Sequence, residues 1–99
     1  MLTSKQRAYL RGLANTIPAT QQIGKEGVTE SVAQQLEMEL KARELVKIKV
    51  LETAMLTARE ASELLCEATG AQPVQCIGAK LVLYKPNPEK PGIVLPREK

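Results

Sequence analysis

The residues of this chain best suited to chemistry form a short loop, Gly24-Lys25-Glu26-Gly27, between a predicted strand and a predicted helix. Because glycine has no Cβ, two glycines three residues apart let the backbone turn sharply and approach another molecule closely. A helix that begins just after the loop directs its first N–H groups and its positive dipole end toward the loop. With the ammonium group of Lys25, these features predict a place for a phosphate group. The same spacing also suits a loop that only connects two elements.

Two catalytic interpretations of this loop fail at the motif. A nucleotide-hydrolysing loop needs Lys-Ser or Lys-Thr after its last glycine, where this chain has Val28. A dinucleotide-binding loop needs a third glycine three residues further on, where this chain has Glu30. The class that remains is the Gly-x-x-Gly loop that clamps the sugar-phosphate backbone of single-stranded nucleic acid.

The composition also argues against an enzyme. The chain has no histidine and no aspartate, so the commonest general base and the commonest metal ligand are absent. Two cysteines, Cys66 and Cys76, are too few for a zinc site without histidine, and we interpret both as structural thiols. We therefore expect a non-catalytic protein without metal or cofactor.

The distribution of charge is more informative than the net charge of +3. Up to Lys25 there are four basic residues and no acidic one, from Glu26 to Glu67 five basic against nine acidic, and after that five against two. This asymmetry predicts a basic side and an acidic side, and a basic side commonly meets nucleic acid. No secretory signal precedes the polar start of the chain, and no apolar run approaches the roughly 20 residues that span a bilayer. We expect a cytoplasmic monomer with no membrane contact.

Apolar periodicity predicts three helices. Their expected N-caps are Thr3, Thr29 and Thr57, and the first and third caps have Gln or Glu three residues later, as in a capping box. Pro18 should end the first helix and Gly70 the third.

Strand patterns separate these helices. The expected strands are residues 19–23, 45–51, 73–77 and 80–85. In the second strand Lys47 and Lys49 alternate with apolar residues and should share one sheet face, either as a solvated face or as a ligand contact. The resulting order, α-β-α-β-α-β-β, predicts an α/β two-layer sandwich with a four-stranded mixed sheet, the crossover helices packing on one face.

Ninety-nine residues suffice for one domain with its own core, which we place at residues 1–86. Residues 87–99 form a Pro-rich, basic C-terminal tail. Its only apolar run, Ile93-Val94-Leu95, either docks on the domain or forms a short edge strand.

Four stretches together resemble the CRM domain (chloroplast RNA splicing and ribosome maturation) in its bacterial stand-alone, YhbY-like form. They are Leu2 to Ala14 (LTSKQRAYLRGLA), Ile23 to Glu30 (IGKEGVTE), Glu44 to Val50 (ELVKIKV) and Val74 to Pro86 (VQCIGAKLVLYKP). The resemblance covers nearly the whole chain.

This resemblance implies a fold similar to the C-terminal domain of bacterial translation initiation factor 3, RNA binding without catalysis, and association with precursors of the large ribosomal subunit. The family's loop corresponds here to Gly24, Lys25, Glu26 and Gly27, followed by Thr29 at the start of the second helix. The family's basic surface would correspond to Lys5, Arg7, Arg11, Lys47 and Lys49. Glu26 departs from what RNA would favour: either its side chain points to solvent, or the loop binds weakly.

Two hypotheses follow. The first is an RNA-binding module that grips backbone phosphates through the loop, with little sequence preference, because the chain has almost no aromatic residues to stack on bases. The second is a protein-interaction module that docks on a ribosomal or other protein through the run Ile93-Val94-Leu95.

Overall fold

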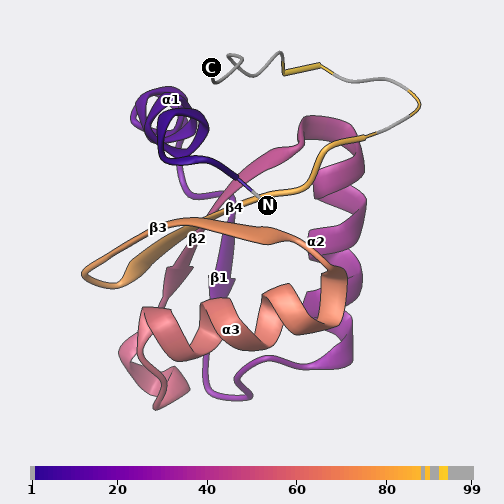
Figure 1. The fold of residues 1–99 in the computed structure, drawn as a ribbon. Coiled ribbons are helices and arrows are strands. Elements are labelled where there is room, and N and C mark those ends of the chain that lie inside the picture. The colour runs from indigo at the N-terminus through magenta and orange to yellow at the C-terminus, as the bar shows by residue number, and fades with distance from the viewer. Residues whose placement is uncertain (1, 88, 90–91, 94–99) are drawn as a thin grey trace.

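Helices and strands alternate along the chain in the computed structural model, which describes residues 2–87, 89, 92 and 93 (Figure 1). The elements are α1 (Ser4–Ala14), β1 (Gln21–Ile23), α2 (Glu30–Arg43), β2 (Leu45–Val50), η1 (Glu52–Ala54), α3 (Ala58–Thr69), β3 (Gln72–Ile77) and β4 (Lys80–Tyr84). The expected α/β order is confirmed. The short 3₁₀ helix η1 is an addition that the sequence patterns did not predict.

Each of the three α-helices has the predicted threonine as its N-cap. In α1 the Thr3 hydroxyl oxygen accepts from the Gln6 N–H at 3.1 Å, and the Gln6 side chain accepts from the Thr3 N–H at 3.1 Å. Thr57 and Glu60 form the same capping box at the start of α3. These reciprocal bonds satisfy N–H groups that would otherwise lack a partner at a helix start.

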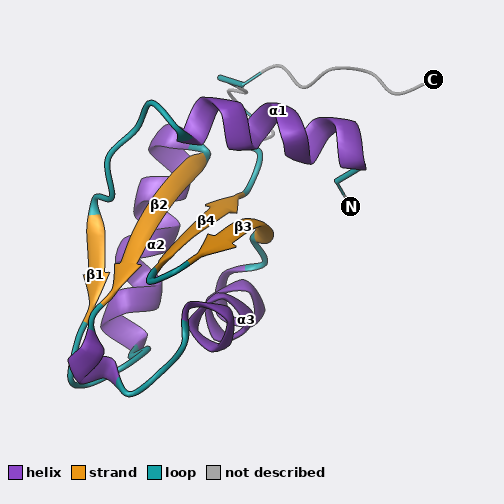
Figure 2. Cartoon of the chain, turned by 90° about the vertical axis from the view of Figure 1, so that its left-hand side faces the viewer, coloured by secondary structure: helices purple, strands orange, loops and turns teal. Residues whose placement is uncertain are grey.

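The four strands form one mixed sheet in the order β1-β2-β4-β3 (Figure 2). β1 runs parallel to β2, whereas β4 pairs antiparallel with both β2 and β3. Between Pro73 and Gln75 the register of β3 shifts against β4, so Val74 is the extra residue of a β-bulge. The edge strand β3 can hold Pro73 because its outer side needs no ladder hydrogen bond.

The main core lies between the sheet and two helices, α2 and α3. Its fully buried side chains include Leu36, Ile48, Leu65, Leu81 and Leu83. This arrangement matches the expected packing of the crossover helices on one sheet face. Figure 1 shows α3 on one side of the strands and α1 on the other.

On that other side, α1 covers only one end of the sheet. Leu10 and Ala14 of α1 join a second, smaller core that includes Leu45, Val82 and Tyr84, residues at the start of β2 and in the last part of β4. Among the residues that the structure describes, no helix lies over the far end of this face, where β2 ends and β4 begins. We call it the open end of the sheet. The expected layer of α2, α3 and sheet is thus present, and α1 adds partial cover on the opposite face.

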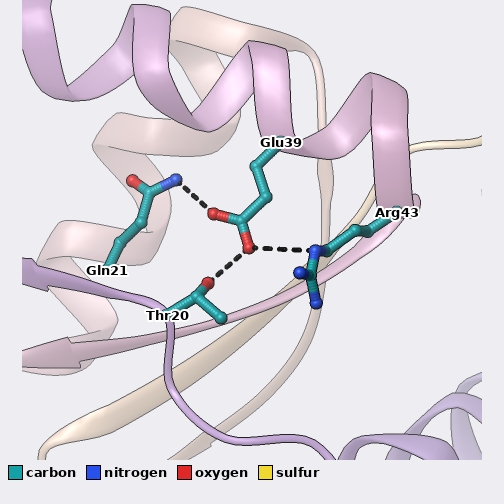
Figure 3. Close-up of polar contacts among 4 residues, drawn as sticks. All are labelled: Thr20, Gln21, Glu39 and Arg43. Atoms are coloured by element: carbon teal, nitrogen blue, oxygen red, sulfur yellow. Dashed lines mark hydrogen bonds and ion pairs between the residues drawn. The ribbon is translucent and has the colours of Figure 1, made fainter.

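A polar cluster holds the start of β1 against α2 (Figure 3). The Glu39 carboxylate accepts hydrogen bonds from the Thr20 hydroxyl and, at 2.8 Å, from the Gln21 side-chain amide. Arg43 pairs with the same carboxylate, its Nε lying 3.8 Å from Oε2. The Gly24 to Gly27 loop connects β1 to α2. This cluster therefore holds the two elements that flank the loop in a fixed relative position.

The beginning of the C-terminal tail returns to the domain at Glu44, which lies between α2 and β2. Glu44 has a φ of 66°, its side chain is buried, and its carboxylate accepts backbone N–H bonds from Asn87 (2.7 Å), Gly92 (2.5 Å) and Ile93 (2.8 Å). Ile93 packs against the core beneath α1, so docking describes it better than an edge strand. Val94 and Leu95 lie outside the described residues.

Candidate nucleic-acid interface

The Gly24 to Gly27 loop leaves β1 as a tight turn, in which the Gly27 N–H donates to the Gly24 carbonyl at 2.9 Å. Gly27 has a φ of 72°, a conformation that side-chain-bearing residues rarely adopt. With Thr29 and Val32, the four loop residues line a shallow hollow of about 220 Å³. The hollow is open to solvent and is not filled by other side chains of the described chain.

The start of α2 faces this hollow. Thr29 is the N-cap, and its hydroxyl oxygen accepts from the Val32 N–H at 3.2 Å. Thr29 therefore shapes the helix end that supplies N–H groups and a positive dipole to the hollow. This is the geometry of an anion site at a helix N-terminus.

The charges around the loop oppose this geometry in part. Lys25 and Glu26 are both exposed, so the Glu26 side chain points to solvent, one of the two arrangements anticipated. Glu30 follows directly in α2. Glu52 lies in η1 next to Thr53, whose hydroxyl oxygen is close enough to Gly24 to contact a side chain substituted there. The loop thus has one lysine, and Glu26, Glu30 and Glu52 belong to the loop or to the segments next to it. Additional cations must come from a neighbouring surface if the loop is to hold a polyanion.

The open end of the sheet supplies such cations. Lys47 and Lys49 lie on the face of β2 opposite Val46, Ile48 and Val50, which belong to the main core. Lys49 is exposed and pairs in register with Gln22, two residues before Gly24, so it lies beside the loop. Lys47 is half-buried and lies two residues nearer to the end of β2 that α1 covers. The two lysines thus lie on a face that α1 does not cover fully.

The basic residues of α1 lie elsewhere. Lys5 and Arg11 are exposed, and the Nε of Arg7 donates to the Pro73 carbonyl at 3.4 Å. α1 packs over Leu45 at the start of β2, whereas the loop adjoins Val50 at its end. Five residue steps along a strand correspond to about 17 Å. Figure 2 likewise shows α1 and the β1–α2 loop at opposite ends of the sheet. The structure therefore divides the predicted basic surface into two parts.

Lys80 was not among the predicted site residues, yet it pairs directly with Lys49 across β2 and β4. Side chains of directly opposed antiparallel residues lie on the same face. Lys80 is exposed and extends the open end of the sheet toward the β3–β4 hairpin. Its alternation with Val82 and Tyr84 was visible in the sequence, but its neighbour on β2 depends on a strand register that the sequence does not show.

The helix-covered side of the molecule is acidic. Glu60, Glu63 and Glu67 of α3 are all exposed, and Glu63 forms an ion pair with Arg59. These carboxylates lie across the sheet from Lys49 and Lys80. A polyanion would be repelled there, so the basic face is the one suited to nucleic acid.

Cys66 and Cys76 are free thiols. Burial raises the pKa of the Cys66 thiol and a nearby Cys76 adds to this, although a hydrogen bond with Ser62 acts in the opposite direction. A raised pKa keeps the thiol protonated and unreactive at neutral pH. This agrees with a structural role for Cys66.

The described residues form no helix long and apolar enough to cross a bilayer. Their fold and site define a small α/β domain that presents an open, lysine-bearing sheet end beside a glycine loop at a helix start. The chain belongs to the CRS1 / YhbY (CRM) domain family, whose model matches residues 2–85. The family is non-catalytic, in agreement with the expectation from composition.

Several relatives match over almost their whole length. The chain is 38% identical over 96 residues to a protein of Bacillus subtilis named "Probable RNA-binding protein YqeI", covering 97% of this chain and 100% of that protein. It is 37% identical over 97 residues to a Haemophilus influenzae protein named "RNA-binding protein", covering 98% and 97%. The solution structure of the hypothetical protein SAV1595 from Staphylococcus aureus matches with a TM-score of 0.77 and 40% identity, covering 97% of this chain and 100% of that one.

Proposed function

We propose that this chain is a non-catalytic RNA-binding protein that holds backbone phosphates in the hollow of the Gly24 to Gly27 loop. The observation that carries the proposal is the position of this open hollow at the start of α2, next to an uncovered sheet face that bears Lys49. The names of the two relatives, which describe RNA-binding proteins, support it. Residues 1–86 would form the binding domain and 87–99 an appended tail.

Recognition should depend on phosphates more than on bases. The interface has no aromatic side chain at the loop or the open end, and hydrogen bonds to phosphates carry no sequence information. The RNA most compatible with a Gly-x-x-Gly loop is single-stranded. Binding should therefore be salt-dependent and similar for different unpaired sequences.

The test is a salt titration of binding to an unstructured oligouridylate by wild type and Lys25→Ala. Loss of one phosphate contact should reduce the slope of log K against log salt by roughly 0.7, which is about a fivefold loss of affinity at 0.1 M salt. Lys41→Ala is the matched control, because Lys41 is exposed on α2 away from the loop and carries the same charge. Unchanged affinity together with an unchanged slope for Lys25→Ala would refute the loop as the contact.

We further propose that the bound RNA belongs to precursors of the large ribosomal subunit, which the resemblance to CRM proteins supports. Crosslinking in cells, followed by sequencing of the attached RNA and identification of the crosslinked peptides, tests it directly. Enrichment of large-subunit RNA on peptides that contain Lys25 or Lys49 is expected. Enrichment of unrelated transcripts would reject this assignment without rejecting RNA binding.

The alternative, a protein-interaction module that uses the tail, has less support. The side chain of Ile93 packs against the core beneath α1, which leaves it little surface for a partner. Binding through apolar residues would also survive high salt, whereas phosphate binding weakens. Pull-down at low and high salt, with and without nuclease, separates the two functions.

A further inference from the structure

Four side chains form a row across the open end of the sheet. The registers pair Gln22 with Lys49, Lys49 with Lys80, and Lys80 with Ile77, so one residue from each strand takes part. All four face away from α2 and α3, because the alternate positions Ile23, Ile48 and Leu81 belong to the main core. We call these four residues the cross-strand row. It spans three gaps of about 4.8 Å, or about 14 Å in total.

The centre of the row concentrates positive charge at a cost to the fold. Like charges directly opposite each other on neighbouring strands are destabilising. In the part of the chain that the structure describes, the ion pairs are Arg43 with Glu39 and Arg59 with Glu63, so no carboxylate neutralises Lys49 or Lys80. An anion between the two ammonium groups would convert this repulsion into attraction.

The outer end of the row is apolar and owes its position to the β-bulge. The extra residue at Val74 changes the alternation of β3, so Ile77 lies on the same face as Lys80 and not over the main core. Its side chain is 64% exposed, although it is large and apolar. Such a side chain beside two lysines can contact the apolar face of a sugar or base while the lysines hold the phosphates.

The inner end of the row leads into the glycine loop. Gln22 precedes Gly24 by two residues, and the Leu51 N–H after β2 donates to the Ile23 carbonyl at 2.9 Å, which keeps the two strand ends together. The row therefore begins two residues before the loop that lines the hollow. It also provides the cations that the loop lacks among Glu26, Glu30 and Glu52.

We propose that the cross-strand row is a second phosphate-binding site, over which an RNA strand held by the loop runs toward the β3–β4 hairpin. Lys80 and Lys49 each bind a backbone phosphate, Gln22 offers its amide, and Ile77 covers the adjoining sugar or base. The strand crosses the sheet at this end and does not follow β2 to the arginines of α1. This inference rests on the proposed RNA-binding function and adds the direction of the strand.

The experiment compares Lys80→Gln with wild type on two oligouridylates. One has about four nucleotides, the length that a Gly-x-x-Gly loop clamps in KH domains, and the other has about twice that length. Lys80→Gln should bind the longer probe about fivefold more weakly at 0.1 M salt, with a slope lower by roughly 0.7, and the shorter probe as wild type does. Lys49→Gln should also weaken binding of the longer probe. Lys41→Gln should bind both probes as wild type does, and Arg11→Gln should not affect the longer probe.

The outcomes separate this inference from the function on which it rests. If Lys25→Ala weakens binding and Lys80→Gln does not, the row is not a contact and the inference is wrong. If Arg11→Gln weakens binding of the longer probe and Lys80→Gln does not, the strand runs along β2 instead. If wild type binds neither probe, the proposed function itself fails. Thermal unfolding provides an independent readout: removing the opposed charge at Lys80 should leave stability unchanged or raise it.

Discussion

Replacing Glu44 by glutamine should release the beginning of the C-terminal tail and lower the free energy of unfolding. In the wild type Oε1 accepts from Gly92 and Ile93, and Oε2 accepts from Asn87. Glutamine keeps one acceptor oxygen and places an NH₂ group where the other stood, so at least one backbone N–H would face a donor. The negative charge that strengthens all three bonds is also lost.

The magnitude follows from two opposing contributions. A hydrogen bond to a charged group contributes about 1.5–3 kcal/mol, whereas holding tail residues costs about 1–2 kcal/mol of conformational entropy for each residue. The attachment is therefore only weakly favourable, by a few kcal/mol at most, and losing one or two of the three bonds detaches it. Because the main core does not depend on the tail, we expect a loss of roughly 1–2 kcal/mol in urea unfolding.

Two measurements check this prediction. Amide hydrogen exchange should become fast at Gly92 and Ile93 in Glu44→Gln, while the amide of Leu81 in the sheet keeps its protection. Glu89→Gln is the matched control, since Glu89 is exposed and the substitution makes the same change in charge. Amides of Gly92 and Ile93 that already exchange freely in the wild type would refute the reasoning.

The same carboxylate gives a pH dependence with a defined sign. Burial acts to raise the pKa of Glu44, but the hydrogen bonds from Asn87, Gly92 and Ile93 outweigh it and leave the pKa below the ordinary 4.5. The stabilisation is therefore complete above about pH 4.5 and is lost as the pH falls through the lower folded-state value. Glu44→Gln should lack this part of the acid dependence, which urea unfolding at a series of acidic pH values would measure.

Three further substitutions test the fold. Gly27→Ala forces a side chain into a φ of 72° and should cost about 1–2 kcal/mol in urea unfolding, together with weaker RNA binding. Thr57→Ala removes the capping box of α3 and should cost about 1 kcal/mol, measured by thermal unfolding. Leu65→Ala leaves a cavity at a fully buried position and should cost about 2–5 kcal/mol, whereas the exposed Leu64→Ala should cost much less.

Local signals predicted most of the secondary structure. Thr3, Thr29 and Thr57 are the N-caps, and Gly70 ends α3 with a φ of 77°. Such features are readable because their hydrogen bonds join residues only a few positions apart. The 3₁₀ helix η1 escaped prediction because a three-residue helix has no periodicity to detect.

The arrangement of the site depended on contacts that periodicity does not report. An apolar stripe shows which side of α1 is buried, but not that α1 packs on the sheet face opposite α2 and α3. The resemblance assigns Arg7 and Arg11 to one basic surface with Lys47 and Lys49, whereas α1 packs at the end of the sheet away from the glycine loop. The pairing of Lys80 with Lys49 and the exposure of Ile77 depend on strand register and on a bulge, which arise from tertiary structure.

The separation of exposed glutamates on α3 from exposed lysines on the far side of the sheet has a kinetic consequence. It gives the molecule a permanent electric dipole directed through the sheet. Near a polyanion, such a body experiences a torque and rotates its lysines forward before any contact forms, so more collisions begin in a usable orientation. Added salt should slow this approach because it shortens the range of the field. The carboxylates that touch no RNA would then still help to determine how fast RNA is captured.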